Sequence, residues 1–238
     1  MTDYVAPTSG GEGGWSGASG TAGTPNFAAA SEQAIVVWPG FNFNSDTITI
    51  TLETNAPDDQ VEVSAGGADD DTCIILSWVS ATTGSAIDLE WSGMDAGDSG
   101  VWFAFGVENS DTTEMAATGF SATDTGVNEN TFTGSVATDT DDLVITGSLA
   151  FRDGIGTGDL YTPGSGETEI AERYDSTNDQ SGYAGYEKAT GTPTACTADA
   201  ADAQHDTDVF IAAVIPTAAA GGLSIPVAMN SYRQLHQG

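Results

Sequence analysis

Two short runs of aspartate have the residue type and spacing that a hard cation requires. Ca²⁺ takes roughly six to eight oxygen ligands from carboxylates and carbonyls. Neither run has the glycine and glutamate positions of an EF-hand loop, and acidic runs also arise as solvated loops in so acidic a chain. We therefore expect no cofactor, with Ca²⁺ as the alternative at Asp69, Asp70 and Asp71, or at Asp139, Asp141 and Asp142.

Catalytic signatures are scarce in the sequence. The two histidines, His205 and His236, are not spaced as zinc ligands, and neither a Gly-x-Ser-x-Gly elbow nor a phosphate-binding Gly-x-x-x-x-Gly-Lys loop occurs. Glycoside hydrolysis needs only two carboxylates about 5–9 Å apart. The expected strands carry few inward-looking acids, and the exceptions are Glu90, Glu169 and Glu172. The sequence predicts a protein that is not an enzyme and assigns no catalytic residue.

Aromatic residues near glycine- and serine-rich loops suggest a different chemistry, the stacking of a sugar ring on an indole or phenol. The candidates are Trp15, Trp91, Tyr161, Tyr183 and Tyr186. Tyr183 and Tyr186 are three residues apart, so they should point to opposite faces of a strand and form no single platform. The alternative is an ordinary buried core, which we favour for Trp78, Trp91 and Trp102.

Charge excludes several classes of partner. The 238 residues include 35 acids but only four lysines and arginines, which gives a net charge of −31. Nucleic acid and anionic lipid bind clustered basic residues, so we expect neither nucleic acid nor membrane insertion. Strong like charge favours solubility, and the scarcity of basic residues favours a saline habitat, where salt screens the repulsion.

The chain is too apolar to be a solvated tail, because 39% of it is hydrophobic and it contains five Trp, six Tyr and nine Phe. No apolar run approaches the roughly 20 residues that span a bilayer. The segment from Met1 to Val5 lacks the basic and apolar regions of a secretory signal. A surface protein without such a signal is a mature fragment, uses another export route, or leaves the cell when the cell lyses. The retained Met1 favours release by lysis, as for a virus particle.

Strand signals dominate the chain from residue 34 onward. Ile48, Ile50 and Leu52 alternate with threonines, the pattern of a half-buried strand, whereas 73–79, 101–105 and 209–214 are apolar on both faces and indicate central strands. No window sustains helical spacing; Thr197–Gln204 comes nearest. We predict an antiparallel, jelly-roll-like β-sandwich with strands near 34–38, 46–52, 60–64, 72–80, 86–91, 101–108, 130–136, 143–151, 167–174, 181–190 and 208–215.

The terminal segments have a different composition. Residues 1–31 are rich in Gly, Ser, Thr and Ala and predict an extended arm that contacts neighbouring subunits, with Trp15 and Phe27 as anchors. Residues 32–216 form the predicted sandwich domain, and residues 217–238 a C-terminal extension. In that extension the predicted assembly residues are Leu223, Ile225 and Tyr232.

The two cysteines, Cys73 and Cys196, lie more than a hundred residues apart. A single long-range disulfide is one alternative, but small disulfide scaffolds use denser cysteine, and nothing in the strand order forces proximity. We predict two buried, reduced thiols.

Several segments resemble β-sandwich proteins on the particle surface of marine and halophilic tailed phages. The similar segments are 71–78, 141–145, 169–174, 181–190 and 208–215, so the resemblance spans roughly residues 60–216. Proteins of this group are tail-fibre, spike or capsid-decoration components, and they share no catalytic residues. The resemblance implies consecutive sandwich strands and a location on the virion surface, but it does not extend to the terminal segments.

These observations predict a non-enzymatic structural protein on the exterior of a tailed phage or virus particle, assembling with itself and with other virion proteins through its termini. The first alternative is a carbohydrate-binding domain that recognises a host surface glycan. The second is a glycan depolymerase.

Overall fold

The computed structural model describes residues 1–41, 48–65, 71–79, 81–111, 115–124, 131–152, 161–176, 180–191, 194–200 and 205–218. Throughout these ranges the regular structure is β-strand, and every pairing between strands is antiparallel. The all-β sandwich architecture predicted from the sequence is therefore confirmed.

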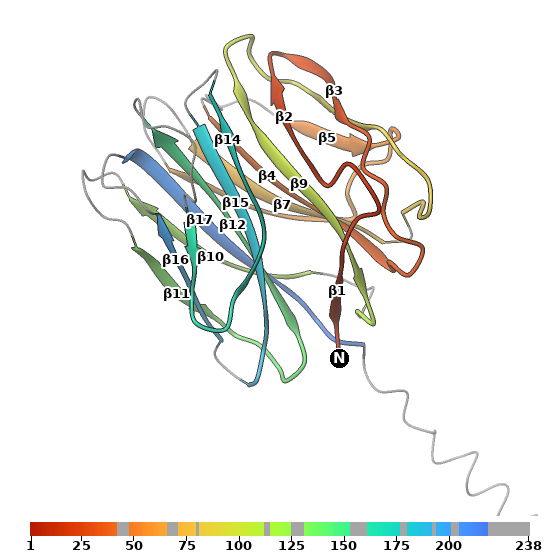
Figure 1. The fold of residues 1–238 in the computed structure, drawn as a ribbon, viewed down its shortest axis with the longest axis vertical. Helices are drawn as coiled ribbons and strands as arrows, with labels where there is room; N and C mark the ends of the chain where they lie inside the picture. The colour runs from red at the N-terminus through yellow and green to blue at the C-terminus, as the bar shows by residue number, and fades with distance from the viewer. Residues whose placement is uncertain are drawn as a thin grey trace, which may run out of the picture.

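The first half of the chain forms two sheets (Figure 1). The first central sheet has the order β1 (Asp3–Val5), β9 (Ser99–Glu108), β4 (Gln33–Phe41), β7 (Asp71–Val79) and β6 (Asp59–Ala65), and β2 (Glu12–Ser16) also pairs with β9. The first outer sheet has the order β3 (Ser19–Gly23), β8 (Leu89–Ser92) and β5 (Thr49–Leu52).

The second half forms two further sheets. The second central sheet has the order β10 (Ala116–Asp124), β17 (His205–Ile215), β12 (Leu143–Arg152), β15 (Gln180–Lys188) and β14 (Thr168–Asp175). The second outer sheet has the order β11 (Thr131–Val136), β16 (Thr194–Ala200) and β13 (Tyr161–Pro163).

Three apolar layers hold the four sheets together. The interface core lies between the two central sheets and includes Ile35, Phe103, Ile145 and Ile211. The first outer core lies on the other face of the first central sheet and is rich in tryptophan, and the second outer core packs β12 and β17 against β11 and β16. Because β4, β7, β9 and β17 are covered on both faces, these strands read as continuous apolar runs rather than alternating ones.

The two halves have the same topology. Replacing β1, β9, β4, β7 and β6 by β10, β17, β12, β15 and β14 converts one central sheet into the other, and β3-β8-β5 likewise becomes β11-β16-β13. Contacts across the interface core are reciprocal: β7 contacts β17 while β15 contacts β9, and β6 contacts β17 while β14 contacts β9. The halves are thus related by an approximate twofold axis between β4 and β12, as two subunits of an isologous dimer would be.

Glycines allow the two central sheets to approach closely at this axis. A Cβ on Gly147 of β12 would lie 2.5 Å from Cγ1 of Val37 in β4. A Cβ on Gly182 of β15 would lie 2.3 Å from Cγ2 of Val101 in β9. Both distances are far inside van der Waals contact, so the interface core requires these two positions to lack a side chain.

The expectation of an extended N-terminal arm is corrected by the structure. Residues 1–31 contribute β1 and β2 to the first central sheet and β3 to the first outer sheet. Trp15 and Phe27 are buried in the chain's own first outer core, with Trp15 stacked on Trp38 at a ring distance of 5.1 Å. The glycines that suggested flexibility instead permit packing, since Gly13 and Gly23 lie against the indole of Trp102.

The sandwich domain therefore begins near residue 3 instead of residue 32, and the two aromatics cannot serve as anchors for a neighbour without leaving this core. At the other end, Thr217 and Ala218 are bonded through their backbone amides to Asp142 and Asn109. The predicted assembly residues Leu223, Ile225 and Tyr232 lie outside the described residues.

The strand predictions hold over the described part of the chain. A strand overlaps each of the eleven predicted windows, whose positions 46–47, 80 and 130 lie outside the described residues. The sequence did not indicate β1, β2, β3, β10, β13 or β16, which are short or poor in large apolar residues. Thr197–Ala200, the start of the nearest helical candidate, belongs to β16, and 201–204 are not described.

Both cysteines are free and buried, as predicted. Cys73 lies in the interface core and Cys196 in the second outer core. Burial raises the pKa of the Cys73 thiol far above its usual range. Burial, with smaller contributions from the charges of Glu167 and Glu187, raises the pKa of Cys196 to about 12.

We expect both thiols to resist alkylation in the folded protein at pH 8, because the thiolate is the reactive form and burial disfavours it. Counting iodoacetamide adducts by mass spectrometry should give none in the native state and two after denaturation. Rapid modification of the native protein would contradict the burial, and an unreduced mass lower by two hydrogens would reveal a disulfide.

Candidate functional site

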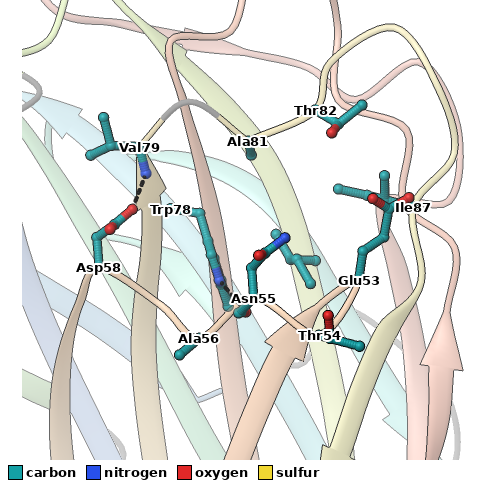
Figure 2. A pocket seen from close by; sticks show the side chains of 11 residues that line it. Glu53, Thr54, Asn55, Ala56, Asp58, Trp78, Val79, Ala81, Thr82 and Ile87 are labelled. Carbon is teal, nitrogen blue, oxygen red and sulfur yellow. Dashed lines mark hydrogen bonds between the residues drawn. The ribbon is translucent and has the colours of Figure 1, made fainter.

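Among the described residues, a well-formed hollow lies at one end of the first half, between the β5–β6 connection and the segment that follows β7 (Figure 2). Its volume is about 420 Å³, within the range of small-ligand pockets. Trp78 and Ile87 supply apolar surface, while Glu53, Asn55 and Asp58 supply polar groups. The other lining residues are Leu52, Thr54, Ala56, Val79, Ala81 and Thr82.

A strained turn forms one wall of the hollow. The backbone amides and carbonyls of Leu52 and Asn55 bond to each other reciprocally, which closes a two-residue hairpin over Glu53 and Thr54. The φ angles of Glu53 and Thr54 are 46° and 71°. Such a turn normally takes Asn-Gly or Asp-Gly, and a β-branched residue in the left-handed region is an outlier. Retained backbone strain of this kind is often associated with ligand sites.

Two hydrogen bonds fix the floor of the hollow. Nε1 of Trp78 donates to the carbonyl of Asn55 at 3.0 Å, and the backbone amide of Val79 donates to Oδ2 of Asp58 at 2.7 Å (Figure 2 draws the second). The indole is 3% exposed, so it offers an edge instead of an open stacking face. The lining contains no histidine, cysteine, lysine or arginine. The arrangement suits hydrogen bonding of a polar ligand and lacks the paired nucleophile and base of covalent catalysis.

Replacing Glu53-Thr54 by Asn-Gly should raise the free energy of unfolding by about 1–2 kcal/mol, because it removes the left-handed strain. Urea unfolding followed by circular dichroism would measure the gain, with Glu53→Gln as the control that changes the charge and keeps the backbone. An unchanged unfolding midpoint for the double variant would show that this turn stores no strain.

The aromatic candidates for sugar stacking are almost all internal. Trp15, Trp91, Tyr161 and Tyr183 are buried, and Tyr186 is partly buried and stacks on Tyr4 at a ring distance of 4.9 Å. The predicted opposite orientation of Tyr183 and Tyr186 is confirmed, since Tyr186 packs on the interface core and Tyr183 on Tyr161. The buried alternative is also confirmed for Trp78, Trp91 and Trp102.

The aspartate runs do not form a cation site among the described residues. Asp69 and Asp70 lie outside these residues, as does the side chain of Asp71. Asp142 accepts hydrogen bonds from the backbone amides of Asp139 and Thr217, so its oxygens cap a turn. Within the ranges that the structure describes, no three histidine, cysteine or acidic side chains gather at one point.

The remaining chemical candidates are dispersed. Glu90 is on the first outer sheet, whereas Glu169 and Glu172 are on β14, where Glu172 accepts a hydrogen bond from the backbone amide of Tyr161. His205 pairs with Arg152 through the backbone of β17 and β12, and neither side chain is described; His236 lies outside the described residues. The structure does not bring these acids and histidines together into one site.

A second hollow of about 450 Å³ lies where the two halves meet, between β2 and the end of β14. Its lining includes Trp15, Trp91 and Arg173, and Arg173 forms an ion pair with Glu12 at 3.8 Å. Sequence reasoning identified neither hollow. The polar groups of the first come from one turn and the loop after it, and the only sequence signal for them is the polar stretch between the strand patterns at 46–52 and 60–64.

Comparison of the chain with protein-family models, with curated proteins and with solved structures finds no match. In the described ranges, no helix has the length and apolar character needed to cross a membrane.

Proposed function

We propose that this chain is a non-enzymatic structural protein on the exterior of a virus particle, of the tail-fibre, spike or capsid-decoration type found on tailed phages. The observation that carries the proposal is the strand order of each half. In the second half the central sheet β10-β17-β12-β15-β14 faces the outer sheet β11-β16-β13, so the first strand lies beside the last and the third beside the sixth. The first half has the same order, with β2 as an additional strand beside β9. This order supports assignment to the jelly rolls, a fold common in viral capsid and lectin domains.

The fused pair of halves supports an architectural role. The interface core joins them through buried apolar residues from both central sheets, which makes the chain a rigid block of four layers. Rigid blocks with a net charge of −31 remain soluble at high concentration in salt and repel one another without it. We propose that the particle and its host live in saline water.

The test is to locate the protein by antibody labelling of intact particles from a saline sample. We expect label on the outside of the particle, and melting curves whose midpoint rises between low and high NaCl. Label only in lysed host debris would contradict the virion assignment, and a midpoint independent of salt would contradict the saline one.

Carbohydrate binding is the second candidate, favoured by the hollow at Trp78, Asn55 and Asp58, whose polar groups and indole edge suit a small polar ligand. A glycan array separates the two. A purely architectural subunit should bind no glycan selectively, whereas selective binding that is lost in Asp58→Asn would favour host recognition.

A further inference from the structure

Over β12 and β15 the outer face of the second central sheet is largely polar, whereas the equivalent face over β4 and β7 of the first is apolar. Val36 of β4 pairs with Leu76 of β7, and every outward-facing residue of these two strands between the Ala34–Trp78 pair and the Trp38–Ile74 pair belongs to the first outer core. In β12 and β15, Thr146 pairs with Gly185. The outward positions of the first half are Ala34, Val36, Trp38, Ile74, Leu76 and Trp78; those of the second are Val144, Thr146, Ser148, Tyr183, Gly185 and Glu187.

Because the two halves share one topology, the fold itself does not require polar groups at these positions. In the first half, apolar side chains occupy the same positions and form part of the first outer core. Moving hydroxyl and carboxylate groups out of water costs free energy that apolar side chains do not incur, so the polar groups in the second half need another explanation.

Three oxygens converge above Gly185. A Cβ built there would lie 2.4 Å from Oε1 of Glu167, 2.4 Å from the hydroxyl of Tyr183 and 2.8 Å from Oγ1 of Thr146. Thr146 donates a hydrogen bond to Glu167, and the amide of Gly164 donates to the other carboxylate oxygen at 3.3 Å. Tyr183 is fully buried, and its hydroxyl interacts with Glu167, although the contact does not have the geometry of a complete hydrogen bond.

A second carboxylate lies beside the first. A Cβ on Gly166, the neighbour of Glu167, would lie 2.7 Å from Oε1 of Glu187. Burial raises the pKa of Glu187, and the charge of Glu167 raises it further. Burial also raises the pKa of Glu167, although its polar contacts with Thr146, Gly164 and Tyr183 oppose that shift by favouring the ionised form.

The described basic side chains do not neutralise this pair. Arg173 pairs with Glu12, and Lys188 pairs with Asp3. Both glutamates are partly exposed, so an ion can reach them from solvent, while Tyr183 closes the inner side. Carboxylate and hydroxyl oxygens are the ligands that hard cations prefer, and the local charge favours a cation with more than one positive charge.

We propose that Glu167, Glu187, Thr146 and Tyr183 form a binding site for a divalent hard cation of the Ca²⁺ type at the end of the second half. The site is distinct from the aspartate runs. It lies at the position equivalent to the hollow of the first half, because Glu167 and Asp58 each precede the edge strand, β14 or β6, and Glu187 takes the place of Trp78. The proposal does not depend on a virion function.

The experiment measures the melting temperature of the full chain at constant ionic strength with CaCl₂, MgCl₂ or NaCl. We expect Ca²⁺ to raise the melting temperature by about 5–10 °C over NaCl when its concentration is about a hundredfold above Kd, and Mg²⁺ to raise it less. Glu167→Gln and Glu187→Gln should each abolish most of the Ca²⁺ increment. Glu62→Gln, which removes an exposed charge from β6, the strand equivalent to β14, should keep it.

Both glutamine variants preserve side-chain volume, and circular dichroism in NaCl checks that they fold. Tyr183→Phe provides a second variant, expected to weaken Ca²⁺ binding measured by calorimetry without changing the number of sites. Equal Ca²⁺ and Mg²⁺ increments in the wild type, or an undiminished Ca²⁺ increment in both glutamine variants, would overturn the proposal and assign the effect to general screening. If the two carboxyls share a proton and bind no cation, the wild type should show equal Ca²⁺ and Mg²⁺ increments, which would also overturn the proposal.

Discussion

Replacing Trp102 by alanine is expected to lower the free energy of unfolding by about 3–5 kcal/mol, among the largest effects of any single substitution in this chain. The indole is 2% exposed and lies in the first outer core. Cβ atoms on Gly13 of β2 and Gly23 of β3 would lie 2.6 Å and 2.4 Å from its ring, so two segments of backbone rest directly on it. Neither glycine can refill the cavity that alanine would leave.

Urea unfolding followed by far-ultraviolet circular dichroism would measure this loss. Trp102→Phe is the matched control: it keeps a ring in the cavity and removes an Nε1 that has no hydrogen-bond partner in the structure, so it should cost much less. A loss below about 1 kcal/mol for alanine would mean that the glycine strands do not pack on the indole. Phe103, the next residue, faces the interface core instead. Replacing Phe103 by alanine therefore measures how much the packing between the two halves contributes to the free energy of unfolding.

Deleting residues 1–31 should leave a chain that does not fold. The deletion removes Trp15 and Phe27 from the first outer core, and losing each ring costs about 3–5 kcal/mol even as a point substitution. It also uncovers β9, which β1 and β2 pair with, and takes β3 from the first outer sheet. Whole-domain stabilities are about 5–15 kcal/mol, so these losses together exceed or exhaust them.

Size-exclusion chromatography and circular dichroism of the truncated chain in high salt would show the outcome. Trp15→Phe is the mild counterpart, expected to fold with a lowered melting temperature because it keeps most of the stack on Trp38. A truncated chain with native spectrum and melting temperature would restore the interpretation of residues 1–31 as an assembly arm.

Local pattern was sufficient for the strands that carry large apolar or β-branched residues. The run from Cys73 to Val79 is apolar on both faces, which predicts a strand covered on both sides, and β7 indeed lies between the interface core and the first outer core. The pattern failed for β2 and β3, where glycine replaces side chains because an indole from another strand already fills the space. A glycine that makes room for a distant ring and one that makes a flexible loop look alike in sequence.

The sequence by itself determined the all-β class, the positions of the apolar strands and the strongly acidic composition, because each follows from residue type and from alternation within a few neighbours. It favoured free thiols over a disulfide, and the structure decided between the two. Only the tertiary structure decided that the chain is two copies of one topology joined across an interface core. The halves share strand order without sharing a readable sequence repeat: Val36 and Leu76 of one correspond to Thr146 and Gly185 of the other. The structure alone could also bring Glu167, Tyr183 and Thr146 to a single point, since these residues come from a turn and two strands and the register of those strands sets which side chains meet.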